Sequence, residues 1–62
     1  MSLKYIDKLA RISTLLESCN EEMTTLILQN ENESFFFKRN CLQFLEFNKK
    51  NQDIIVSILK NN

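Results

Sequence analysis

Near its middle the chain reads Gln29-Asn30-Glu31-Asn32-Glu33-Ser34, a run that contains no apolar side chain. Asn and Ser side chains form hydrogen bonds with nearby backbone and therefore favour turns over helix interiors. We expect one helix to end at about Gln29 and a second to begin at about Phe35, with Ser34 as its N-cap. Residues 1–62 then form a single all-α domain, an antiparallel two-helix hairpin that resembles a coiled coil.

On the N-terminal side of this run, apolar residues recur in alternating steps of four and three, the pattern of a coiled-coil helix. The pattern predicts a helix from about residue 2 to about residue 29, with Ser2 as its N-cap. One stripe of this helix should face the second helix and form its half of the hairpin core. The predicted core residues are Tyr5, Leu9, Ile12, Leu16, Cys19, Met23 and Leu26.

On the C-terminal side, the same spacing predicts a helix from about residue 35 to about residue 60. Asn48 and Asn51 occupy two of its inward positions, and the polar run around them leaves open whether this helix is continuous. Folding back about the turn would set Leu26 opposite Phe37. The core residues predicted on this helix are Phe37, Cys41, Phe44, Ile55 and Ile58.

The second helix also carries apolar residues that point about 80° to 160° away from Phe37, where the first helix does not reach. These residues are Phe35, Leu42, Leu45 and Val56. Together they amount to several hundred Å² of apolar surface, which a small monomer rarely leaves exposed. We predict that they bind a partner, either another helical protein or a second copy in a dimeric four-helix bundle. Scattered exposed side chains and frayed ends are the alternative explanation.

The composition argues against catalysis and against a bound metal or cofactor. The chain has no His, no Gly and only two Cys, so it lacks a neutral-pH base, a phosphate-binding loop and a complete zinc ligand set. We expect Cys19 and Cys41 to be small buried hydrophobes rather than reactive thiols. The sequence therefore predicts a binding protein and not an enzyme.

Charge and hydropathy limit the classes of partner. Eight basic and eight acidic side chains cancel, which argues against nucleic-acid binding. Because no apolar run approaches about 20 residues and no signal-peptide pattern is present, we expect a cytoplasmic protein without membrane insertion. The first helix is basic early and acidic late, opposite to the preference of its own dipole. An antiparallel second helix would bring Lys38 and Arg39 near that acidic end.

The layout resembles a known family, the small helical-hairpin co-chaperones of the type III secretion needle subunit. The resemblance covers nearly the whole chain, from Leu3 to Leu59. It rests on the aromatic start of the second helix, Ser34-Phe35-Phe36-Phe37, and on its aliphatic end, Asp53-Ile54-Ile55-Val56-Ser57-Ile58-Leu59. It implies a cytoplasmic bacterial virulence protein that pairs with a larger helical-repeat chaperone and helps to keep the needle subunit unpolymerised.

Overall fold

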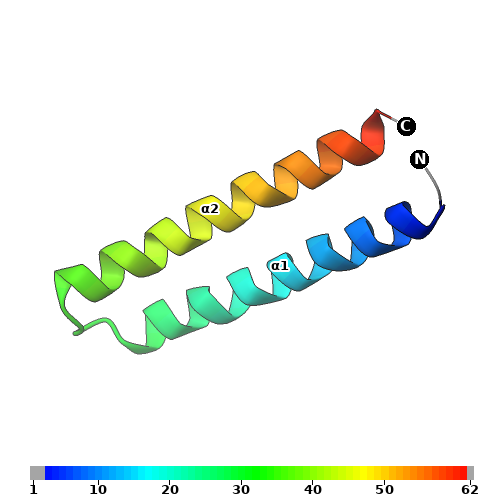
Figure 1. Ribbon diagram of the computed structural model, residues 1–62. Helices are drawn as coiled ribbons and strands as arrows, with labels where there is room; N and C mark the ends of the chain where they lie inside the picture. Colours follow the sequence, from blue (N-terminus) through cyan, green and yellow to red (C-terminus); the bar gives the residue numbers. More distant parts are fainter. Residues whose placement is uncertain (1–2, 62) are drawn as a thin grey trace.

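The computed structural model describes residues 3–61, which form two α-helices joined by a short turn. Helix α1 spans Leu3–Gln29 and helix α2 spans Phe35–Lys60. They run side by side in opposite directions, so that the start of α1 and the end of α2 lie at the same end of the molecule (Figure 1). The described residues contain no strand, and the predicted all-α hairpin is confirmed.

The turn is built from the local hydrogen bonds that its residue types favour. The Asn30 side-chain amide donates to the carbonyl of Leu26 (2.8 Å), and the Asn30 backbone N–H donates to Ile27 (3.2 Å), which closes the end of α1. Ser34 has extended backbone angles (φ −60°, ψ 157°), and its hydroxyl accepts a hydrogen bond from the Phe37 backbone N–H (3.2 Å). Ser34 is therefore the N-cap of α2 as predicted, whereas the predicted cap Ser2 lies outside the described residues.

Helix α2 is continuous through the polar run around Asn48 and Asn51, so the break that the sequence left open is absent. Two side chains of this run take part in packing against α1. Asn48 is buried, and Gln52 is half-buried with hydrogen bonds to α1. The polar run is therefore helical, and part of it faces α1.

The interface between the helices is a narrow seam in which buried and half-buried residues follow four-three spacing. On α1 the seam residues are Ile6, Leu9, Ser13, Leu16, Asn20, Met23 and Ile27. On α2 they are Cys41, Leu45, Asn48, Gln52, Ile55 and Leu59. Only Cys41, Asn48 and Ile55 are classed as buried among the described residues, each with 8% of its surface exposed.

The seam corrects part of the predicted hairpin core. Leu9, Leu16, Met23 and Phe37 are half-buried, and Cys41 and Ile55 are buried. The other predicted core residues are exposed: Tyr5, Ile12, Cys19, Leu26, Phe44 and Ile58. A two-helix seam covers only about two of every seven positions on each helix. On α1 a further set of apolar residues, Tyr5, Ile12, Cys19 and Leu26, borders the seam and stays exposed.

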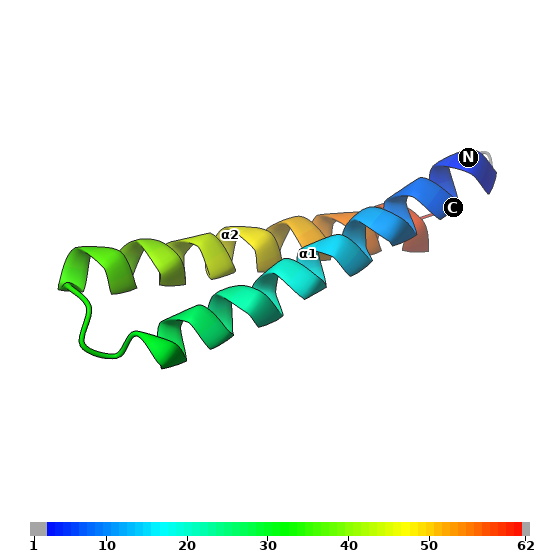
Figure 2. The same cartoon turned by 90° about the horizontal axis from the view of Figure 1, so that it is seen from below.

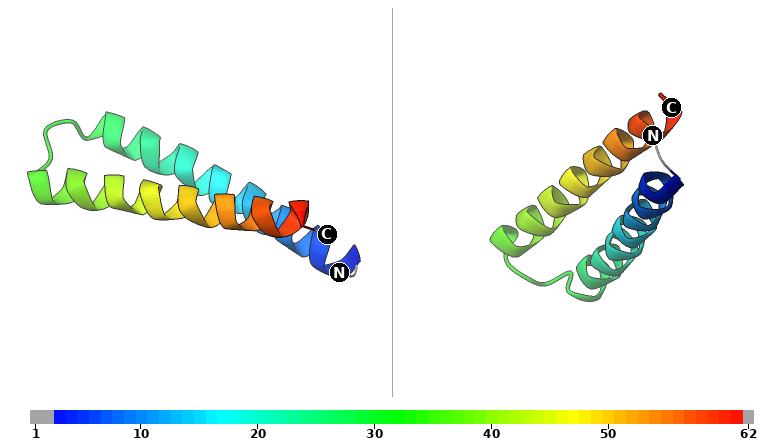
Figure 3. Two further views of the ribbon diagram at one scale, coloured as in Figure 1. Left: turned by 90° about the horizontal axis from the view of Figure 1, so that it is seen from above. Right: turned by 45° about the vertical axis from the view of Figure 1, so that its right-hand side comes forward.

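The molecule is an elongated rod with principal extents of 47 × 14 × 11 Å. Figures 2 and 3 show two nearly straight helices and no further element over either broad side of the pair. Most of the side chains outside the seam, among those whose burial the structure describes, are accordingly exposed.

Candidate interaction surface

The centre of the seam is polar. The Gln52 amide donates to the Ser13 carbonyl (3.1 Å), and the Asn20 amide donates to the Gln52 side-chain oxygen (3.2 Å). Asn20 Oδ1 and Asn48 Nδ2 are buried without a hydrogen-bond partner. An unsatisfied buried polar atom costs about 1 to 3 kcal/mol, although a polar layer in a seam can fix the register of two helices. The hairpin therefore gains little stability from the middle of its own interface.

Large apolar side chains, in contrast, lie outside the seam on both helices. Phe35 and Phe36 expose 79% and 76% of their surface, and Tyr5 exposes 63%. Further exposed apolar residues are Ile12, Leu15, Leu26, Leu28, Leu42, Phe44, Phe47, Ile54 and Val56. Aromatic and aliphatic residues of this size are usually buried in a stable monomer. This distribution is typical of a chain that packs against another polypeptide.

The total accessible surface leads to the same conclusion. The chain exposes 5200 Å², whereas a compact monomer of 7.4 kDa is expected to expose roughly 4,200 Å². The excess of about 1,000 Å² is similar to the roughly 800 Å² that each partner loses in a standard protein interface. The hairpin thus has enough spare surface for one such interface.

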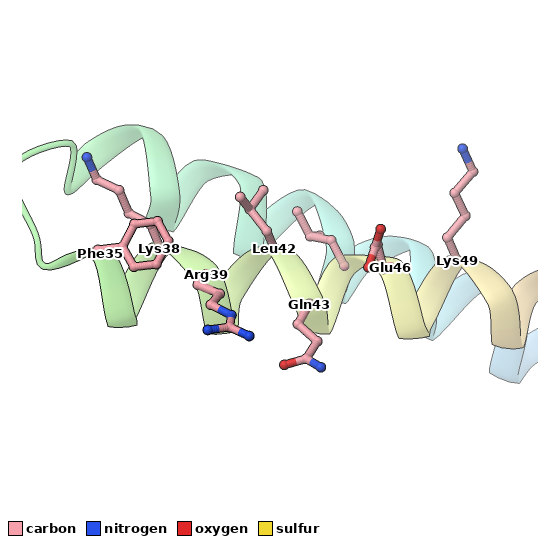
Figure 4. A pocket seen from close by; sticks show the side chains of 8 residues that line it. Phe35, Lys38, Arg39, Leu42, Gln43, Glu46 and Lys49 are labelled. Carbon is pink, nitrogen blue, oxygen red and sulfur yellow. The ribbon is translucent and has the colours of Figure 1, made fainter.

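An open depression along the first half of α2 gathers three of the four residues predicted to bind a partner. Phe35, Leu42 and Leu45 contribute its apolar part. Figure 4 shows Phe35 and Leu42 among the side chains that line it. Val56, which is also exposed, lies further along the helix and outside the depression. Leu45 corrects the prediction in one respect: it is half-buried and shares the spacing of the seam residues, so it also packs toward α1. We call Phe35, Leu42, Leu45 and Val56 the α2 patch.

The charged residues that line the depression are mainly basic. Lys38, Arg39 and Lys49 line it together with a single acidic residue, Glu46. Figure 4 shows the long side chains of Lys38 and Lys49 extending near opposite ends of the depression. A lining that combines apolar side chains with mainly basic ones favours a partner that combines apolar and acidic side chains.

A second candidate surface runs along α1, and four of its residues, Tyr5, Ile12, Cys19 and Leu26, were predicted to lie in the hairpin core. Tyr5, Ile12, Leu15, Cys19 and Leu26 are all exposed there. The signal was present in the sequence, because apolar residues occupy three of the seven heptad positions rather than two. Such a wide apolar face is typical of helices that touch two neighbours in a bundle.

The structure offers no arrangement typical of a metal site among the described residues. Within residues 3–61 no three His, Cys, Asp or Glu side chains gather in a group that could hold a metal ion. Both cysteines are free thiols: Cys41 is buried as predicted, whereas Cys19 is exposed, contrary to the prediction. In the same part of the chain, neither helix has the length and apolar character needed to cross a bilayer.

Comparison of the chain with protein-family models, with curated proteins and with solved structures finds no match.

Proposed function

We propose that the chain is a non-catalytic protein-binding module that holds a helix of another polypeptide. The observation that carries this proposal is the reversed distribution of side chains, with Asn48 buried in the seam and large residues such as Phe35 and Leu42 exposed. Burying an apolar side chain of this size against a partner contributes about 1.5 to 3 kcal/mol. A hairpin with so little core of its own gains stability from such contacts.

The α2 patch is the proposed binding site, and its chemistry describes the partner. Phe35, Leu42 and Leu45 supply an apolar surface along one helix, and Lys38, Arg39 and Lys49 supply positive charge around it. An amphipathic helix with an apolar stripe and acidic flanks complements both features. Aromatic residues such as Phe35 frequently act as anchors in interfaces of this kind.

The family resemblance gives this proposal a specific form. In that form the protein works in the bacterial cytoplasm, pairs with a larger helical-repeat chaperone and helps to keep a type III secretion needle subunit unpolymerised. The features that support this form are the two long helices, the polar turn capped by Ser34 and the exposed Phe35 and Phe36 at the start of α2.

The proposal is tested by placing carboxylates in the α2 patch. Tagged protein with Leu42→Glu and Val56→Glu should retain a helical circular dichroism spectrum, because both positions are exposed in the hairpin. Capture of the partner from native cells should fall about 100-fold or more, since two apolar contacts are lost and the new charges repel an acidic partner.

The control carries the same charge change at two exposed polar positions of α2, Asn40→Glu and Ser57→Glu. It should capture the partner as the unmodified protein does. The proposal fails if the unmodified protein captures no polypeptide, or if the patch variant and the control capture it equally.

A further inference from the structure

Five exposed apolar residues of α1 lie on one continuous stripe, whereas Leu28 lies outside it. Together with two charged residues they repeat the four-three spacing of a helical interface. The α1 stripe consists of Tyr5, Lys8, Ile12, Leu15, Cys19, Glu22 and Leu26, all of them exposed. Each of its residues directly precedes a seam residue, so at 100° per residue the stripe lies about 100° around α1 from the seam, and α2 does not cover it. It therefore has the layout of a second helical interface with no partner helix among the described residues.

The two charges of the α1 stripe are placed symmetrically about its centre. Lys8 and Glu22 each lie seven residues, or about two helical turns, from Leu15. If a second α1 packs antiparallel on the first with a two-fold axis at Leu15, Lys8 of each chain faces Glu22 of the other. Ile12 then faces Cys19 of the other chain, and Tyr5 faces Leu26. A parallel arrangement would instead place like charges together.

We propose that the α1 stripe binds the α1 stripe of a second copy of this chain, antiparallel and with the two-fold axis near Leu15. The charge pattern selects this occupant, because the stripe is complementary to itself only in that orientation.

Helix α2 contributes to the same broad side of the hairpin. Phe44, Phe47 and Ile54 are exposed, and each directly precedes a seam residue of α2. The residues of the α1 stripe precede the seam residues of α1 in the same way. In an antiparallel helix pair such corresponding positions lie on the same side of the seam, so these three residues flank it on the side of the α1 stripe. A two-fold axis at Leu15, perpendicular to the rod, would bring α2 against its own copy near Phe47. The assembly is then an antiparallel four-helix bundle.

This dimer goes beyond the proposed function and is independent of it. Phe35, Leu42 and Val56 flank the seam on the other broad side. The α2 patch therefore stays open in the dimer. Loss of partner capture and loss of the dimer are consequently separate outcomes of separate variants.

Sedimentation equilibrium of the purified full chain tests the dimer directly. The unmodified protein should sediment as a species of twice the 7.4 kDa chain mass. Leu15→Glu should abolish this species, because it places two carboxylates together at the axis. Thr14→Glu, at an exposed position on the other side of α1, should leave the dimer intact, as should Leu42→Glu with Val56→Glu.

Charge reversal tests the orientation. Lys8→Glu and Glu22→Lys should each weaken the dimer about tenfold, because each places like charges together twice per dimer. The variant with both changes should restore the affinity. Neither reversal opposes the α1 dipole, so a weaker dimer does not reflect loss of helix.

Thiol labelling gives a readout without any substitution. Cys19 should react quickly in dilute protein and slowly at high concentration, whereas buried Cys41 should react slowly at both.

Three results would each overturn the proposed dimer. The chain could stay monomeric at millimolar concentration, the dimer could be unaffected by Leu15→Glu, or the double charge reversal could fail to restore the affinity that each single reversal weakens. The proposal would also be overturned if the variant with Leu42→Glu and Val56→Glu, in which the α1 stripe is unchanged, lost the dimer.

Discussion

Replacing Ile55 with Ala should lower the free energy of unfolding by about 2 to 5 kcal/mol. Ile55 is one of the two apolar side chains classed as buried among the described residues. The loss should be large relative to the total because a small domain is stabilised by only about 5 to 15 kcal/mol. Urea unfolding followed by far-ultraviolet circular dichroism measures the change.

The matched control is Ile54→Ala, which removes the same atoms from the adjacent residue. Ile54 is 57% exposed, so its replacement should have a much smaller effect at concentrations where the chain is monomeric. Equal losses for the two variants would mean that α2 is rotated about its axis relative to the seam described here.

Replacing Asn51 with Pro should destabilise the hairpin by about 3 kcal/mol or more. Asn51 lies well inside α2, which is continuous from Phe35 to Lys60. Proline would remove a backbone hydrogen bond there and clash with the carbonyl of Phe47 one turn earlier. Thermal unfolding should show a large drop in melting temperature together with a loss of helical signal.

Asn51→Ala serves as the control and should be neutral or slightly stabilising, because Ala favours helix more than Asn does. If proline is tolerated at this position, the polar run in α2 contains a break in solution, and the continuous helix is wrong.

The ends of the helices were predictable from the sequence because local chemistry determines them. The Asn30 side chain bonds the end of α1 and the Ser34 hydroxyl bonds the start of α2, and both partners lie within four residues. Short-range hydrogen bonds of this kind depend little on the rest of the fold. The antiparallel hairpin followed from them, since two long helices joined by so short a turn lie side by side.

The rotation of α1 about its axis was not predictable by the same reasoning. Tyr5 and Leu26 belong to one apolar stripe, and Ile6 and Ile27 belong to the next, so the sequence alone supports both choices. The structure selects the second stripe, in which Gln52 of α2 reaches Asn20. That contact joins residues distant in sequence, and periodicity carries no information about it.

The candidate surface was predictable in part. Exposed positions for Phe35, Leu42 and Val56 followed from their angle to Phe37 around the helix, whereas Leu45 lies close enough to the seam to pack toward α1. Four residues of the α1 stripe, Tyr5, Ile12, Cys19 and Leu26, were assigned to the core because they are apolar and regularly spaced. The spacing of apolar residues identifies a helix face that will be buried. It does not tell whether α2 or a helix of a second chain packs against that face.

The central claim is that apolar residues exposed in the hairpin contact another polypeptide. A photo-crosslinking amino acid in place of Leu42, incorporated in native cells, tests it most directly, with Thr14 on the polar side of α1 as the control position. We predict a covalent adduct with a second polypeptide from position 42, well above the level from position 14. Equal, background levels of adduct at the two positions would contradict the claim.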